Sequence, residues 1–241
     1  MTLWALSDVH VGFEANRKAV EAMGEHRDDW LILAGDTGDT LAQLELVLEV
    51  VTPEDPYTVW PATGHVIAPC FTLYDYSFGP AGLTAEQAVA WAAESKVQCA
   101  DELLLSPAPF NSRAAWCHDR VTATEARLDA LPATARLILV NHFPLRPDVT
   151  VLPRIPRFAI WCGTTRTADW HTRYRADVVV SGHLHMRSTR WRDGVRFEEV
   201  SLGYPAQWQQ SKTADHYLRP ILPEPPARDG WGKAQTVIRH W

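Results

Sequence analysis

Six aspartate and histidine side chains stand directly after short apolar runs that lie far apart in the chain. Aspartate and neutral histidine are ligands that suit manganese, iron and zinc ions. One histidine after a strand is commonly capped or solvated, but four such strand endings in one chain favour a shared site. We expect one or two divalent ions there, with manganese or iron favoured and zinc as the third candidate. The expected ligands are Asp8, His10, Asp36, His142, His183 and His185.

Two of these motifs carry their candidate ligands two residues apart. Residues i and i+2 of an extended segment point the same way, so Asp8 with His10, and His183 with His185, can each converge on one ion. Asp36 stands alone after its apolar run and could bridge two ions. Two neighbouring ions can deprotonate a water molecule and clamp phosphoryl oxygens during in-line displacement. The spacing therefore favours hydrolytic phosphoryl chemistry.

Continuous apolar runs precede all of these ligands and are typical of strands buried on both faces. In open α/β sheets, ligands bind beyond the carboxyl ends of the strands. An Asp-Gly pair at 193–194 between alternating residues predicts a hairpin. The strands expected to carry ligands are 3–6, 30–34, 137–140 and 178–180, and the expected helices are 16–24, 40–51, 84–95, 112–131 and 167–174. This order predicts the α/β class.

Length and composition bound the remaining possibilities. The chain has 241 residues, and we assign 1–210 to one domain and the Pro-rich segment 211–241 to an extended or partly disordered tail. A net charge of −6 argues against non-specific binding to nucleic acid or to an anionic membrane. No apolar run approaches the roughly 20 residues of a membrane span. Four cysteines without a C-x-x-C pair, and no secretory leader, predict reduced thiols in a cytoplasmic protein.

The ligand motifs resemble those of the calcineurin-like metallophosphoesterase superfamily. They are Ser7-Asp8-Val9-His10, Gly35-Asp36, Asn141-His142 and Gly182-His183-Leu184-His185. Longer segments are similar to one actinobacterial branch, the phosphopantetheinyl hydrolases; they are 51–56, 73–78, 161–171 and 193–205. The resemblance implies a four-layer α/β-β/α sandwich with a two-metal site. It also implies hydrolysis by a metal-bound hydroxide of a phosphodiester, such as that of a phosphopantetheinyl carrier protein, or of a phosphomonoester.

The resemblance also assigns each ligand to a metal. By that assignment the first metal would be held by Asp8, His10, Asp36 and His185, and the second by Asp36, His142 and His183.

One departure from the family pattern concerns the second metal. The family has a further strand ending in Gly-Asn-His, whose Asn ligates the second metal and whose His assists the phosphoryl group. The interval 37–51 of this chain contains neither Asn nor His. We therefore expect a lost ligand, a lost general acid and a missing strand with its following loop and helix region. The sheet edge left open would be covered or would pair with another copy of the chain.

Five further residues are secondary candidates. His171 could face the metals as a catalytic acid or substrate contact, although a surface histidine is the commoner interpretation of this pattern. Second-shell or substrate contacts are the other expectation, for Asp75, Asn141, Arg166 and Tyr204.

Three functions stay open at this point. The first is a metal-dependent phosphoesterase that acts on a phosphorylated small molecule or carrier protein. The second is a divergent biosynthetic metalloenzyme on the same fold, with redox or lyase chemistry and iron as the metal. The third is a non-catalytic protein that binds a phosphorylated partner.

Overall fold

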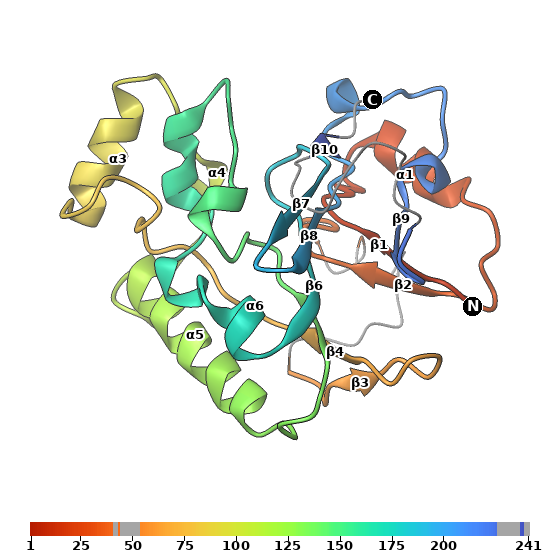
Figure 1. Ribbon diagram of the computed structural model, residues 1–241. Coiled ribbons are helices and arrows are strands. Elements are labelled where there is room, and N and C mark those ends of the chain that lie inside the picture. Colours follow the sequence, from red (N-terminus) through yellow and green to blue (C-terminus); the bar gives the residue numbers. More distant parts are fainter. Residues whose placement is uncertain (41–42, 44–53, 226–236, 239–241) are drawn as a thin grey trace.

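The computed structural model describes residues 1–40, 43, 54–225 and 237–238, in which two β-sheets face each other (Figure 1). The smaller sheet has the strand order β2-β1-β9. Strand β1 (Leu3–Leu6) lies parallel to β2 (Trp30–Leu33) and antiparallel to β9 (Arg219–Leu222). The amino-terminal strand is thus paired on both sides.

The larger sheet has the strand order β10-β7-β8-β6-β5-β4-β3. Strands β4, β5, β6 and β8 are mutually parallel, whereas β3, β7 and β10 run antiparallel to their neighbours. The bounds are β3 Thr58–Val59, β4 Val66–Pro69, β5 Leu137–Val140, β6 Ala176–Ser181, β7 Ser188–Arg192, β8 Val195–Glu199 and β10 Val237–Ile238.

Helices cover the outer face of each sheet, with α1 beside the smaller sheet and α5 and α6 beside the larger one (Figure 1). The α-helices are α1 Glu14–Glu21, α3 Ala85–Ala93, α4 Ala100–Leu104, α5 Arg113–Asp129 and α6 Trp170–Arg173. The 3-10 helices are η1 Pro147–Val149, η2 Pro156–Trp161, η3 Thr165–Thr167, η4 Pro205–Gln207 and η5 Ala214–Tyr217. No helix in the described part of the chain is both long and apolar enough to cross a membrane.

The alternation of side chains along β5 shows how the layers are held together. Leu137 and Leu139 pack with the helices on one face, and Ile138 and Val140 pack against the smaller sheet on the other. All four side chains are buried because both faces of the strand are covered. The order helix, sheet, sheet, helix confirms the four-layer α/β-β/α fold expected from the sequence.

Local sequence signals locate most of the elements. Thr84 caps α3, and its hydroxyl accepts a hydrogen bond from the Gln87 backbone N–H in the expected capping box. Ser112 caps α5 in the same way through the Ala115 N–H. The hairpin β7–β8 turns at Asp193 and Gly194, both with positive φ, which suits this tight turn. The helix expected at 40–51 lies almost wholly outside the described residues.

Part of the segment expected to be a tail belongs to the domain. Residues 214–217 form η5, and β9 completes the smaller sheet beside β1. Ile221 is fully buried between the two sheets. The boundary expected at residue 210 therefore does not mark the end of the fold, because the Pro-rich composition concealed a short apolar strand.

We expect Ile221→Ala to destabilise the protein by about 2–5 kcal/mol, because the truncation leaves a cavity between the sheets. Urea denaturation of both proteins measures the change. Leu103→Ala is the matched control, since Leu103 is 78% exposed and its truncation should stay within about 0.5 kcal/mol. Equal midpoints for the two variants would show that β9 is not part of the core.

Candidate metal centre

Five of the six expected ligands have a left-handed backbone conformation. Non-glycine residues adopt positive φ only rarely, and each instance costs about 1–3 kcal/mol. The φ angles are 51° at Asp8, 42° at His10, 47° at Asp36, 71° at His183 and 51° at His185. This backbone strain is concentrated just beyond the carboxyl ends of β1, β2 and β6, where the chain turns sharply to bring the side chains together.

The Asp8 carboxylate lies at the centre of this region and is completely buried. Its Oδ2 accepts hydrogen bonds from the Ser7 hydroxyl at 2.5 Å and the Ser201 hydroxyl at 2.8 Å. The backbone N–H of His183 donates to the same oxygen at 3.0 Å. These donors come from the ends of β1, β6 and β8, so one carboxylate ties both sheets together and its Oδ1 remains directed at the histidines.

The electrostatics of the centre keep Asp8 ionised. Burial alone would raise the pKa of Asp8, but the charge of His142 and the hydrogen bond from His185 lower it below its ordinary value. Burial likewise opposes the charged form of His185, yet its bond to Asp8 raises the pKa of that imidazole. Burial, followed by the charge of His142, lowers the pKa of His183 to about 3. His183 is therefore neutral and has a lone pair to offer.

One group of possible ligand atoms comes from Asp8, His10 and His185, and these atoms all lie within 4.8 Å of one another. The Nε2 atoms of the two imidazoles are 3.3 Å apart, and His185 Nε2 is 3.2 Å from Asp8 Oδ1. His185 Nδ1 lies 2.8 Å from Gln207 Oε1. Since an amide oxygen can only accept, Nδ1 carries a proton, and Nε2 can bind a cation that replaces its hydrogen bond to Asp8.

The second group comprises Asp8, Asp36 and His142. His142 Nδ1 donates to the Ala34 carbonyl at 3.0 Å, which leaves its Nε2 for a cation. Asp36 Oδ1 also lies 3.4 Å from His10 Nδ1 in the first group. The sequence suggested Asp36 as the bridging carboxylate, and the geometry places Asp8 in both groups with Asp36 close to each.

The donor set fits divalent cations. His183 Nε2 is buried and has no hydrogen-bond partner among the described residues, which is costly for a polar atom unless something binds it. The His142 and His183 rings lie 5.3 Å apart with an interplanar angle of 78°. Two carboxylates and four imidazoles converging in this way can coordinate one or two ions.

Two glycines allow this close approach. A Cβ at Gly182 would collide with Ser7 Oγ and Asp8 Oδ2. Gly35 has a φ of +95°, and a Cβ there would lie 2.7 Å from His142 Nδ1. The glycine before each motif is therefore required by packing against the ligands themselves.

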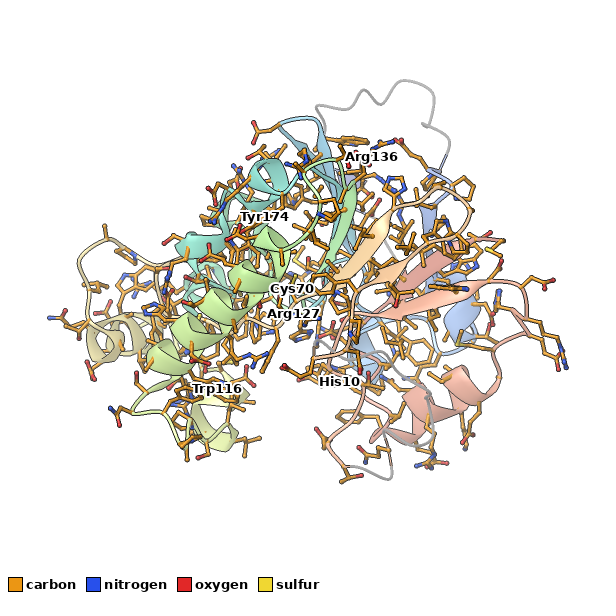
Figure 2. The ribbon with its side chains drawn as sticks, turned by 90° about the horizontal axis from the view of Figure 1, so that it is seen from below. His10, Cys70, Trp116, Arg127, Arg136 and Tyr174 are labelled. Carbon is orange, nitrogen blue, oxygen red and sulfur yellow. The ribbon has the colours of Figure 1, made fainter. Side chains whose placement is uncertain are left out.

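Two secondary candidates lie where the sequence suggested. The Tyr204 ring stacks on His10 with a centroid distance of 4.6 Å and meets His185 edge-on at 4.7 Å. Asn141 is buried, accepts from the Thr72 N–H and fixes the turn that presents the neighbouring imidazole. Figure 2 shows His10 between the part of the molecule that carries Trp116 and α5 and the part that carries α1.

His171 does not join the centre. Its Nε2 lies 2.8 Å from Asp193 Oδ2, in the hairpin turn that precedes β8. Because β8 runs parallel to β6, this turn stands at the opposite end of the sheet from His183. A catalytic role for His171 has no geometric basis: the short helix α6 leads into the start of β6, whereas the ligands follow its end.

Asp75 and Arg166 also lie elsewhere. Asp75 accepts hydrogen bonds from the Thr164 and Ser77 hydroxyls and pairs with His118 at 2.9 Å, so it organises a turn. Arg166 is exposed on η3. Neither residue forms a hydrogen bond or an ion pair with a candidate ligand.

Sequence reasoning missed three contributors to the centre. Gln207 fixes the His185 ring, and the Ser201 hydroxyl supports Asp8. Asp101, on α4, lies close enough to His142 and Asp36 for their charges to act on it. Burial is the largest influence on this carboxyl and raises its pKa. None of the three follows an apolar run, so no local pattern marked them.

Glu102 holds the helix that carries Asp101. Its carboxylate Oε1 accepts from the Tyr76 hydroxyl at 2.7 Å and from Trp161 Nε1 at 3.1 Å. Arg113 adds an ion pair at 3.3 Å and donates to the Glu102 carbonyl at 2.7 Å. A helix of five residues is thereby fixed beside the metal centre.

We expect Gly182→Ala to lower metal affinity about 10- to 100-fold, because the new methyl group displaces Asp8 and the hydroxyls that orient it. Metal content after dialysis, measured by mass spectrometry, reports the change. Gly24→Ala is the control, since the backbone there is not left-handed and a Cβ would make only an ordinary van der Waals contact, 3.6 Å from Asp215 Oδ1. Full metal content in Gly182→Ala would contradict this account of Asp8.

Comparison with known proteins agrees with the geometry. No protein-family model matches the chain. A curated protein of Mycobacterium tuberculosis, [acyl-carrier-protein] phosphodiesterase PptH, is 41% identical over 279 positions, which cover 95% of this chain and 86% of the relative. The crystal structure of phosphopantetheinyl hydrolase (PptH) from the same organism superimposes with a TM-score of 0.85, covering 95% of this chain and 98% of that one. The chain belongs to the phosphopantetheinyl hydrolase family, a hydrolase family with this α/β fold, as the ligand motifs indicated.

Proposed function

We propose that this protein is a metal-dependent phosphodiesterase that hydrolyses the bond between phosphopantetheine and a carrier protein. The observation that carries the proposal is the convergence of Asp8, Asp36 and four histidines just beyond the carboxyl ends of β1, β2, β5 and β6. The related mycobacterial protein, 41% identical, is described as an acyl-carrier-protein phosphodiesterase.

Each ligand side chain has a defined task in this proposal. Divalent ions in such a site lower the pKa of a bound water and neutralise charge on phosphoryl oxygens. Asp8 and Asp36 supply the negative charge that retains the ions, and the Nδ1 bonds of His142 and His185 aim their Nε2 atoms inward. Carboxylates with imidazoles and no thiolate suit manganese or iron. Tyr204 shields one face of His10 from water.

The proton for the leaving group needs another source, because no Gly-Asn-His segment is present in 37–51. We assign this role to Asp101. Its helix is fixed beside the centre by Glu102, and its carboxyl responds to the charges of His142 and Asp36. The groups acting on it are Cys99, Arg113, Asp36 and His142. Burial favours its protonated form, which is the form a general acid requires.

The effect of removing this acid on the rate of hydrolysis should depend on the leaving group. We expect Asp101→Asn to slow hydrolysis of an alkyl phosphodiester about 10²-fold or more, and that of bis-p-nitrophenyl phosphate much less. The reason is that p-nitrophenolate leaves without a proton. In the wild type, kcat should fall as pH rises through the pKa of Asp101, because the acid loses its proton. This decrease of kcat with pH should be absent from Asp101→Asn.

The control for Asp101→Asn is Asp119→Asn, an exposed aspartate on α5. Steady-state kinetics on both substrates across pH compare the three proteins. An equal loss on both substrates would mean that Asp101 only supports the structure.

Metal dependence tests the proposed function itself. We expect chelator-treated protein to lose hydrolysis of holo-carrier protein and to recover it with manganese or iron. Asp36→Asn should lower kcat/KM about 10²-fold or more, because it removes charge between the two ligand groups, whereas Asp119→Asn should not. Mass spectrometry of the carrier protein detects loss of phosphopantetheine.

The outcome of that experiment also separates the alternatives. Bound metal without turnover would favour a redox or lyase reaction if iron alone restored another activity. Binding of a phosphorylated carrier protein without turnover or metal dependence would instead favour a non-catalytic role.

Compartment and assembly complete the proposal. The four cysteines are buried free thiols, which suits a reducing cytoplasm. Strand β2 is the edge of the smaller sheet among the described residues, and Trp30 and Leu31 on it are 36% and 43% exposed. We propose that this edge pairs with a second copy of the chain, which light scattering can detect.

A further inference from the structure

A groove of about 740 Å³ runs between α1 and the segment 205–213. Its volume lies within the range of about 300–1,000 Å³ that is usual for small-molecule sites. Helix α1 packs against η5 on one side of the groove, so both walls belong to the folded domain (Figure 1). No step of the proposed hydrolysis uses this groove.

The groove lies next to the metal centre. Phe13, which lines it, lies edge-on to His10 at 6.3 Å and to Tyr204 at 5.7 Å between ring centroids. Pro205, the residue after Tyr204, also lines it. Phe13 and Tyr204 are 46% and 44% exposed, two large aromatic side chains left uncovered where the groove meets the ligands. Exposed aromatic residues at such a junction suit contact with a ligand.

The lining mixes short apolar side chains with scattered polar groups. Ala19, Ala22 and the Trp208 ring supply apolar surface, and Gln210, Ser211 and Thr213 supply hydrogen-bonding groups. The indole N–H of Trp208 already donates to Asn16, so the ring contributes its face and edge alone.

The charged groups of the groove are partly balanced. Lys18 pairs with Glu14 across one turn of α1 at 2.5 Å, while Lys212 stands on the opposite wall. Such a lining suits a long neutral chain that alternates amides with short apolar links, and it offers little to a strongly charged ligand.

We propose that this groove binds the pantetheine arm of the substrate while the phosphodiester lies at the metal centre. The inference rests on the proposed function, because only a substrate of that class carries such an arm. A pantetheine arm is uncharged, contains two amides joined by short methylene links, and bears a geminal dimethyl group next to the phosphate. The dimethyl end would meet Phe13 and Tyr204, and the amides would reach the polar wall.

Binding measured without turnover tests this inference. Calorimetric titration of manganese-loaded protein compares 4′-phosphopantetheine with inorganic phosphate, which shares the anionic group but lacks the arm. We expect 4′-phosphopantetheine to bind the wild type at least tenfold more tightly than phosphate. Equal affinity for the two ligands would overturn the inference.

A steric block then locates the arm. Ala22 is the exposed C-cap of α1 and lines the groove, and Ala22→Trp should reduce the preference for 4′-phosphopantetheine to less than threefold. Ala130→Trp is the matched control, since Ala130 is the exposed C-cap of α5 and lies outside the groove. Ser211→Trp, on the opposite wall, should act like Ala22→Trp and covers the case in which that variant fails to fold.

The results separate this inference from the proposed function. If both Ala22→Trp and Ser211→Trp still bound 4′-phosphopantetheine at least tenfold more tightly than phosphate, the arm would lie outside the groove. A preference lost in both variants but kept in Ala130→Trp would support the groove even if the wild type hydrolysed no phosphodiester, in which case the proposed function alone would fail.

Discussion

A carboxylate with no exposure to solvent determines the architecture of the centre. An ionised group moved out of water is strongly destabilising unless donors and opposite charges replace its hydration. Asp8 receives two hydroxyls and one backbone N–H, and it faces imidazoles on its other side. These partners come from both sheets, so the two sheets can pack at this end only if the ligands are already gathered. The packing of the two sheets at this end and the position of Asp8 therefore depend on each other.

Backbone strain follows from the same constraint. A strand that ends on a buried carboxylate must turn within one or two residues, and the left-handed conformation provides that turn. Glycine would relieve the strain at Asp8, His10 or His183, but glycine has no side chain to offer. The glycines stand instead at positions 35 and 182, where a Cβ would collide with His142 or Asp8. Glycine therefore stands where a side chain would collide with a candidate ligand, and Asp or His stands where a side chain is needed to bind the ion.

The sequence predicted that the six candidate ligands lie together, because each of them follows a strand and an apolar run with a polar ending marks such a place. It predicted the hairpin at Asp193 and the caps at Thr84 and Ser112 for the same reason, since each signal is local. It misjudged His171, because one-dimensional patterns do not say which end of a sheet a short helix reaches. It could not identify Gln207 or Asp101, whose roles arise from tertiary contacts alone.

In the proposed mechanism, the absence of Asn and His from 37–51 would alter the coordination of the metal without altering the charge of the site. The alignment with the mycobacterial relative spans 279 positions, so at least 38 of them have no counterpart among the 241 residues here. An Asn ligand is neutral and adds no charge to a site. The Coulomb attraction of the two aspartates for cations is therefore about as strong here as in a site that has the Asn. What changes is the number of donors around the ion and the origin of the proton for the leaving group. Asp101 on α4, the acid proposed above, lies in a helix that Glu102 fixes through Tyr76 and Trp161, and its role would need no residue from that segment. Phosphodiester hydrolysis without a Gly-Asn-His segment would therefore require that the acid come from α4.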